Sequence, residues 1–353
     1  MNKTIFSYDK EQSLLISGVA VLFMVVHHVL GFDYLRLEEN TLVPLLEIHG
    51  ISLGKVFATF GKICVSVFAF NTGYVIWKKR ANYTPVNNVR RILKFLLCYW
   101  VVYSLFLMAG VVYNDQMPAL PDFFLNLIGL RTGTFVSFVN VPYAWYVCFY
   151  VFFVLSSPFV IRLCSRGKKV CAGIFLIWFT LDQLLPVITF SGVIGEILRI
   201  YISVGLFALS GLLFSKYHLF DVFAKYVPAK LGLYATMFVC LIVVRQLSVY
   251  LFSATYMDVL FAPIFIFLSV NIIYTKNIYP ILNVVFKPLG KYSMNIWFLH
   301  GLFFTGSMHL QWILYLPRFS TFVLIWGMSL LFVISVGVAF LQNSVLKITG
   351  IQK

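Results

Sequence analysis

The sequence is poor in charged residues and contains no long polar stretch. Charged side chains make up 11% of its 353 residues and hydrophobic side chains 61%, and the mean hydropathy is +0.92. Soluble domains carry about 25% charged residues, so a soluble protein is excluded. We predict an all-α integral membrane protein in contact with the lipid bilayer. Because no polar block could form a second unit, we expect a single membrane-embedded domain over residues 1–353.

Several common signals of chemistry are missing. The six cysteines form no C-x-x-C pair, and none has a histidine at zinc-ligand spacing, so we expect packing residues and no metal site. The lack of a glycine-rich P-loop argues against a nucleoside triphosphatase. No basic stripe with interleaved aromatics occurs outside the span ends, so we expect no nucleic-acid partner. The first residues, MNKTIFSYDKEQ, contain no small-residue cleavage site, and the first apolar run is expected to act as the targeting signal.

Long apolar runs dominate the chain. About 20 apolar residues cross a bilayer. Short connections separate the runs, and Lys and Arg gather on alternate connections, which is the pattern of cytoplasmic loops. We therefore predict about ten transmembrane helices with both termini in the cytoplasm, and this topology accounts for the net charge of +15. The predicted spans are 12–32, 57–77, 92–113, 143–162, 170–190, 196–215, 231–252, 257–275, 291–312 and 320–345.

Two adjacent histidines stand inside the first run. The stretch SGVAVLFMVVHHVLG places His27 and His28 in its outer half, where polar groups are costly and usually face a bundle interior or a water-filled cavity. Adjacent helical residues point about 100° apart, so one ring can face a cavity while the other packs on a neighbouring helix. An interhelical hydrogen bond made only for stability explains the pair equally well. Arg245 lies about 14 residues into the run 231–252, which is too deep for an ordinary position at the membrane surface.

Cations gather at the inner end of the third run. Arg90, Arg91 and Lys94 begin this run, directly after a basic connection. Paired guanidinium groups match the oxygens of a polyphosphate, although the ordinary loading of a cytoplasmic loop with positive charge gives part of the same pattern. We treat the three residues as candidate phosphate ligands.

Two further stretches supply candidate lining residues. In the ninth run, GKYSMNIWFLHG places Ser293, Trp297 and His300 along one helix face, which indicates either a cavity lining or a packing face with one satisfied histidine. Trp145 and Tyr146 open the fourth run. They could stack on a sugar ring or belong to the aromatic belt at the membrane surface.

Four stretches, in this order, resemble the acyltransferase-3 family of bacterial ten-span membrane acyltransferases. They are SGVAVLFMVVHH, GKICVSVFAFNTGYVIWKK running into VRRILK, AWYVCFYVFFVLSSPFV and LGKYSMNIWFLHG, and they extend over nearly the whole chain. Members of this family commonly move acetyl groups from acetyl-CoA to sugars of surface polysaccharides. The resemblance therefore implies a membrane-bound O-acyltransferase of the bacterial inner membrane, with acyl-CoA and a carbohydrate acceptor as its partners.

The resemblance also implies roles for particular residues. The family's catalytic histidine corresponds to His28, and His27 gives a double-histidine variant of the motif. In the implied mechanism a neutral His28 takes the proton of a sugar hydroxyl as that hydroxyl attacks the thioester. The remaining implied or candidate contacts are Arg90, Arg91 and Lys94 for the acetyl-CoA phosphates, and Trp145, Tyr146, Arg245, Ser293, Trp297 and His300 for the substrates.

The chain departs from the family pattern at two places. The family usually has an Arg eleven residues before its histidine, and this chain has Ser17 there. The second-span signature reads Asn71-Thr72-Gly73, where Ser usually precedes the Gly. The missing cation leaves open how charge is balanced at that end of the donor site, and whether acetyl-CoA is the acyl donor.

Two other classes of protein fit part of the sequence. A transporter or exporter of polysaccharide or its precursor would use intramembrane His and Arg as proton or substrate sites, although no internal repeat with paired broken helices is evident. A structural membrane subunit would explain the hydropathy, but it would leave the histidines and the inner Arg pair without a role.

Overall fold

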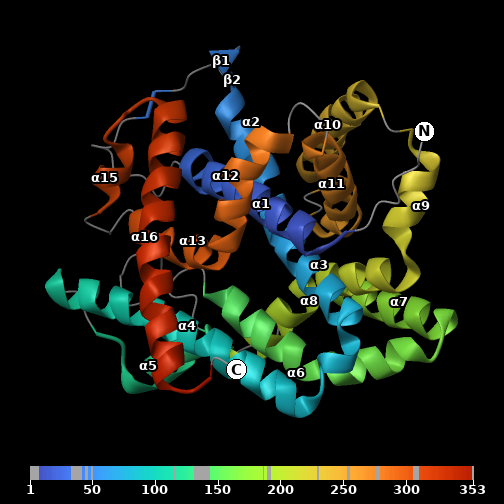
Figure 1. Ribbon diagram of the computed structural model, residues 1–353, viewed down its shortest axis with the longest axis horizontal. Coiled ribbons are helices and arrows are strands. Elements are labelled where there is room, and N and C mark those ends of the chain that lie inside the picture. Colours follow the sequence, from blue (N-terminus) through green and yellow to red (C-terminus); the bar gives the residue numbers. More distant parts are fainter. Residues whose placement is uncertain are drawn as a thin grey trace.

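A computed structural model describes residues 8–32, 42–43, 47–48, 51–113, 117–130, 144–185, 187–188, 192–228, 230–252, 255–274, 279–304 and 310–351. Within these residues the chain is mostly helical (Figure 1). The elements are α1 (Lys10–Gly31), β1 (Glu47–Ile48), β2 (Ile51–Ser52), α2 (Leu53–Gly61), α3 (Ile63–Lys78), η2 (Arg80–Asn82), α4 (Pro85–Val112), α5 (Leu120–Leu127), α6 (Trp145–Ser165), α7 (Lys168–Leu184), α8 (Gly192–Tyr217), α9 (Leu219–Tyr226), α10 (Leu231–Phe252), η3 (Thr255–Met257), α11 (Asp258–Ile273), α12 (Tyr279–Lys291), α13 (Ser293–Leu299), α14 (Gly301–Phe304), α15 (Gln311–Tyr315) and α16 (Ser320–Ile348). The two strands form one antiparallel pair.

Eight helical segments of the described residues are long and apolar enough to cross a membrane. The chain is therefore an all-α, multi-pass membrane protein, as its composition predicts. The eight are α1, α2 with α3 (Gly54–Lys78), α4, α6, α8, α10 (Leu231–Leu251), η3 with α11 (Thr255–Ile273) and α16.

The other two predicted spans have a different local structure. In the run 170–190, helix α7 has 17 residues and ends at Leu184, and the last residues of that run lie outside the described part. Over the predicted span 291–312 the regular helical hydrogen bonding is interrupted at Tyr292 and at His300, which gives α13 and α14, although His300 keeps helical backbone angles. Residues 305–309 of that run also lie outside the described part. Broken helices are tolerated at membrane depth when protein buries the freed backbone, and the residues on either side of His300 are buried.

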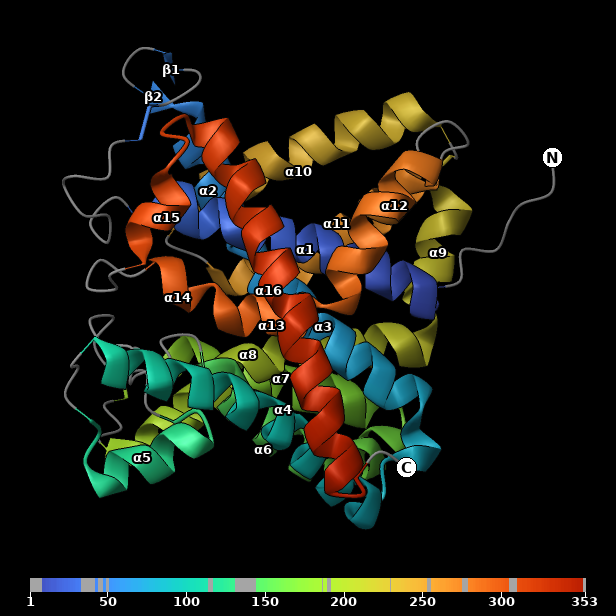
Figure 2. The same cartoon turned by 60° about the vertical axis from the view of Figure 1, so that its left-hand side comes forward.

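Helices α1, α3 and α11 occupy the centre of the bundle (Figure 2). Between 56% and 61% of the apolar windows that contain them are buried, against 17% for α10 and 33% for α4 and α16. An apolar helix with an unburied surface must face lipid in a membrane protein. Hence α10 and α16 form part of the outer wall, whereas Ser66 and Asn71 of α3 are buried in protein.

Glycines allow the central helices to approach closely. A Cβ atom at Gly18 of α1 would overlap the carbonyl oxygen of Phe286 in α12, and one at Gly73 of α3 would overlap that of Ala208 in α8. Small residues drive helix association in membranes because they bring backbones into contact. These two crossings fix α1 and α3, which carry much of the site described below.

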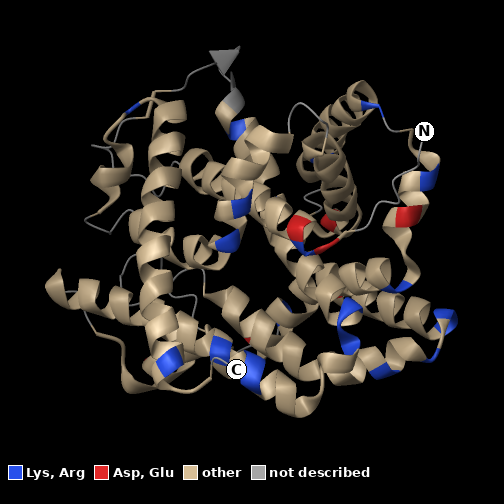
Figure 3. Cartoon of the chain, viewed as in Figure 1, with Lys and Arg blue, Asp and Glu red and all other residues tan. Residues whose placement is uncertain are grey.

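The connections separate into two sides (Figure 2). The start of α1, the start of α12 and the ends of α3 and α16 lie towards the right of the view, while the hairpin, α5 and α14 lie towards the left. Charged residues occupy short stretches, and the long helices are uncharged over most of their length (Figure 3). This arrangement is compatible with the predicted topology, in which both termini share the cytoplasmic side.

Candidate active site

Two histidines from distant parts of the chain meet inside the bundle. The ring of His28, in α1, lies 4.6 Å from the ring of His300, at the turn between α13 and α14. Phe32 stacks on the other face of His28 at 5.3 Å, and Phe304 contacts both imidazoles. His300 is fully buried and His28 is half-buried. The packing of α13 against α1 therefore places an imidazole of the ninth predicted span beside the histidine of the first.

A hydrogen bond fixes which nitrogen of His28 is basic. Its Nδ1 lies 2.8 Å from the carbonyl oxygen of Met24, one helical turn earlier. A carbonyl oxygen can only accept a hydrogen bond, so Nδ1 carries the proton and donates. In the neutral ring, Nε2 is then the nitrogen that can take a proton.

His27 is held on a different side of α1. Its Nδ1 donates to the carbonyl oxygen of Ala58 in α2 at 2.7 Å. Gly61, near the end of α2, allows this approach, because a Cβ there would overlap the Phe23 carbonyl oxygen and lie 3.1 Å from the Cβ of His27. The two histidines thus have separate surroundings, as their angular separation on a helix predicts.

A cavity of about 360 Å³ lies between α1, α3, α4, α6 and α13. Ser293, Trp297 and Tyr146 line it. The Trp297 ring lies 5.4 Å from that of Tyr146, 5.9 Å from that of Trp145 and 6.3 Å from that of His300. These aromatic rings join the cavity to the pair of histidines.

Tyr83, just before α4, lines the same cavity. The Arg91 guanidinium lies over the Tyr83 ring, 4.1 Å from its centroid, and donates to the Asn82 carbonyl oxygen at 3.0 Å. Burial raises the pKa of Tyr83, so its phenol stays neutral near pH 7. Arg90 and Lys94 occupy the same first turns of α4 with exposed side chains, and they do not line the cavity. Of the three predicted phosphate ligands, Arg91 contacts a residue that lines the cavity.

Arg245 is not brought to this cavity. Its side chain is fully buried, and Nε and Nη2 bind the two carboxylate oxygens of Asp258 at 2.6 and 2.8 Å. Nη1 donates to the carbonyl oxygens of Thr59 and Phe60 at 3.0 and 3.2 Å. Because these carbonyls lie where α2 ends, Arg245 supplies bonds that the interrupted helix cannot make internally. The side chain ties α10 to α2 and α11.

The structure adds lining residues that the sequence analysis did not select. Thr72 and Asn71 line the cavity, and the Thr72 hydroxyl lies 3.1 Å from that of Tyr146. Asn71 accepts a 2.6 Å hydrogen bond from the Tyr8 hydroxyl. Two adjacent polar residues inside an apolar run are a usable signal for such a lining. Tyr83 lies in a connection, and no sequence pattern singles it out.

Ser17 lines the cavity near the start of α1. Its hydroxyl donates to the carbonyl oxygen of Ser13 at 2.8 Å, which keeps it against its own helix. No Lys or Arg occurs among the described residues that line this cavity. The departure from the family pattern therefore leaves an uncharged and largely aromatic wall.

Comparison with known proteins gives one result. A family model described as an acyltransferase domain matches residues 15–342. The matched range covers nearly the whole chain and includes every described residue that lines the cavity. No curated protein and no solved structure matches the chain. The resemblance in the four stretches is thereby confirmed, and the chain belongs to the acyltransferase-3 family of membrane acyltransferases.

Proposed function

We propose that this protein transfers an acyl group, with acetyl as the first choice, from cytoplasmic acyl-CoA to a hydroxyl of a cell-surface or lipid-linked carbohydrate. The observation that carries the proposal is the path from Arg91 to His28. Arg91 stacks on Tyr83, Tyr83 and Trp297 both line the cavity, and the ring of His300 contacts the rings of Trp297 and His28. In a bacterial inner membrane with both termini of the protein in the cytoplasm, Arg91 and Tyr83 would lie on the cytoplasmic side, where acyl-CoA arrives.

The cavity suits the narrow part of an acyl-CoA. Its volume of about 360 Å³ lies within the range of small-molecule sites, and its wall is mainly aromatic with a few hydroxyl and amide groups from Ser293, Thr72 and Asn71. An amide-containing pantetheine arm needs this mixture of apolar surface and sparse polar partners. The phosphates would remain at the cytoplasmic end, where Arg91, Arg90 and Lys94 supply positive charge.

His28 is proposed as the general base. The acceptor oxygen attacks the thioester carbonyl carbon, the carbon–sulfur bond breaks, and CoA leaves as the thiolate. Nε2 of His28 accepts the hydroxyl proton during the attack and can return it to the leaving sulfur, so that protons balance. General-base help of this kind contributes about 10²–10⁴-fold to the rate.

His300 and His27 are proposed to support this base. His300 lies against the His28 ring and limits its orientation, while His27 holds α1 to α2 through Ala58. Trp145 and Tyr146, packed near Trp297, are proposed to contact the bound substrates at the reacting end.

Labelled acyl transfer tests the proposal. Purified protein is incubated with acetyl-CoA radiolabelled on the acetyl group, and binding and slow transfer or hydrolysis of label are measured. We expect His28→Ala to bind acetyl-CoA but to lose turnover by about 10²–10⁴-fold. His218→Asn is the matched control, because His218 is exposed outside the bundle core with an ion pair only to Asp221 among the described residues. Failure of well-folded protein to bind acetyl-CoA would refute the donor, and full turnover of His28→Ala would refute the base.

Membership of an acyltransferase family does not favour the transporter alternative. An exporter would also not require the Arg pair for its affinity towards acetyl-CoA. Replacement of Arg90 and Arg91 together by Ala should chiefly raise the Michaelis constant for acetyl-CoA if the proposed donor is correct.

A further inference from the structure

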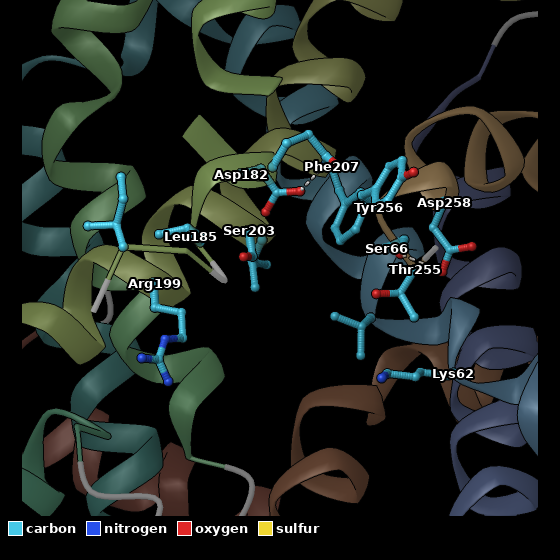
Figure 4. Close-up of a pocket in the computed structure, with 14 residues that line it drawn as sticks. Lys62, Ser66, Asp182, Leu185, Arg199, Ser203, Phe207, Thr255, Tyr256 and Asp258 are labelled. Atoms are coloured by element: carbon cyan, nitrogen blue, oxygen red, sulfur yellow. Dashed lines mark hydrogen bonds between the residues drawn. The ribbon is translucent and has the colours of Figure 1, made fainter. Parts of the chain in front are cut away.

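A second and larger cavity lies away from the histidine pair. It has a volume of about 640 Å³ and is bounded by α3, α7, α8, η3 and α11 (Figure 4). Its charged residues stand in the half of the bundle that faces outwards in the proposed topology: between α2 and α3, near the end of α7, in the first third of α8 and at the start of α11. None of the residues that line the first cavity lines this one among those the structure describes.

Two cations face this cavity from opposite sides. Lys62 stands on the α3 side and Arg199 on the α8 side, with open space between them (Figure 4). Within the described part of the chain, neither side chain forms an ion pair, and both are exposed. Cations so close to a membrane are costly unless water, lipid or a ligand solvates them. Their placement across one cavity suits a ligand that carries a negative charge.

The rest of the lining favours a ligand with hydroxyl groups as well. Asp182 is half-buried in the wall and accepts a hydrogen bond from Gln183 at 3.3 Å. Ser203 and Tyr256 stand nearby in Figure 4. A carboxylate repels a simple anion but accepts hydrogen bonds from hydroxyls, and an aromatic ring can cover the apolar face of a sugar.

The carboxylate of the opposite wall is already paired. Asp258 lines the cavity, but Arg245 already neutralises its charge through two hydrogen bonds. Ser66 donates to the same carboxylate at 3.2 Å. The charge that remains available to a ligand is therefore that of Lys62, Arg199 and Asp182.

We infer that this outer cavity binds an acidic carbohydrate, whose carboxylate or phosphate lies between Lys62 and Arg199 and whose hydroxyls bind Asp182 and its neighbours. The role of this carbohydrate as the acceptor, or as a sugar unit next to the acceptor, rests on the proposed function, whereas its binding does not. Lys62 directly follows Gly61, which packs on His27. A ligand at Lys62 would therefore contact the residue next to the point where α2 packs on α1, the helix that carries His28.

Binding to purified protein in detergent tests the inference. The probes are a tetrasaccharide of alternating glucuronic acid and N-acetylglucosamine, a neutral N-acetylglucosamine tetramer of equal length, glucose 1-phosphate and glycerol 3-phosphate. We expect the acidic tetrasaccharide to bind and the neutral one to bind at least tenfold more weakly. Glucose 1-phosphate reports whether phosphate can replace carboxylate. If glycerol 3-phosphate binds as tightly as the saccharides, the cavity is a site for lipid headgroups and the carbohydrate inference is wrong.

Charge variants locate the site. Lys62→Gln and Arg199→Gln should each weaken the acidic tetrasaccharide by about tenfold and leave the neutral one unchanged. Arg162→Gln is the matched control, since it removes one exposed cation of α6 that does not line the cavity. Equal effects of all three variants, or none at Lys62 and Arg199, would overturn the inference.

Acetyl-CoA binding in the same samples separates this inference from the proposed function. Loss of acidic-saccharide binding in the two cavity variants with unchanged acetyl-CoA affinity supports the inference. Wild-type protein that binds acetyl-CoA but no acidic saccharide overturns the inference alone. Protein that binds the saccharide but no acetyl-CoA overturns the proposed function alone.

Discussion

At the scale of single residues, the adjacent histidines of α1 illustrate how position on a helix separates two tasks. His28 faces His300, and His27 donates to Ala58 on another helix. We expect His27→Ala to lower the unfolding temperature, because a net hydrogen bond of about 1 kcal/mol is lost, and to reduce turnover less than His28→Ala does. Thermal unfolding and label transfer, measured on both variants, check this expectation. A larger loss of turnover in His27→Ala would mean that the two roles are reversed.

Arg245 is the residue whose interpretation changes most between sequence and structure. It is fully buried and bonded to Asp258 and to two backbone carbonyls. Removing one partner of a buried ion pair costs about 3–5 kcal/mol, because the other charge is left unpaired. Arg245→Ala should therefore sharply lower the fraction of monodisperse protein after size-exclusion chromatography. Arg162→Ala, at an exposed site, should not. A well-folded Arg245→Ala variant with impaired substrate binding would instead support the role of Arg245 as a substrate contact, which the sequence analysis predicts.

At the scale of elements, the junction between α2 and α3 positions both sites. It brings α1 within contact at Gly61, and it begins the segment that carries Lys62 and Ser66. Gly61→Ala should separate α1 from α2, because the new Cβ meets backbone rather than a flexible side chain. We expect a destabilisation of about 1–3 kcal/mol, typical of overpacking, together with a loss of turnover.

A glycine in open space gives the control for this change. Gly173, in α7, has no atom within 4 Å of an added Cβ, so Gly173→Ala should be neutral or stabilising by about 0.5–1 kcal/mol. The two unfolding temperatures are compared in the same detergent. Similar shifts for Gly61→Ala and Gly173→Ala would show that the close approach of α1 to α2 does not matter.

At the scale of the whole molecule, the number of membrane crossings depends on the two predicted spans that are not among the eight long helices, and α7 is one of them. Helix α7 has 17 residues, which is about 26 Å at 1.5 Å per residue and slightly less than the hydrocarbon thickness of about 30 Å. A short helix can still cross when the bilayer thins or flanking residues snorkel. We therefore expect α7 to cross, as the ten-span topology requires.

Cysteine labelling of intact cells distinguishes the topologies. Single cysteines are placed at Arg166, before α7, and at Val187, after it, in a background without the six native cysteines. An impermeant maleimide should label the cysteine at 187 and leave the one at 166 protected until the membrane is opened. Labelling of both positions from the same side would show that α7 does not cross and that the termini cannot both be cytoplasmic by the ten-span count.

The sequence by itself determined the class of protein, most of the spans and the family. Long apolar runs leave the backbone no choice but helix in a bilayer, so α1, α4, α6, α8, α10, α11 and α16 follow from hydropathy alone. His28, Trp145, Tyr146 and His300 could be selected because they match the motifs of the family that the chain resembles, and Trp297 because it shares one helix face with His300. That His28 lies against His300 could not be read from the sequence, because this contact depends on how α13 packs against α1.

Only the tertiary structure decided which polar groups share a cavity. Arg245 and Arg199 have the same chemistry in the sequence, yet one is paired with Asp258 in the core and the other faces an open cavity. Tyr83 carries no pattern, but the packing of α4 against α6 places it in the cavity wall beside Arg91. Hydropathy acts on each segment separately, whereas a site depends on distances between segments. Those distances are set by close helix contacts such as Gly18 on Phe286 and Gly61 on Phe23, which involve residues far apart in the sequence.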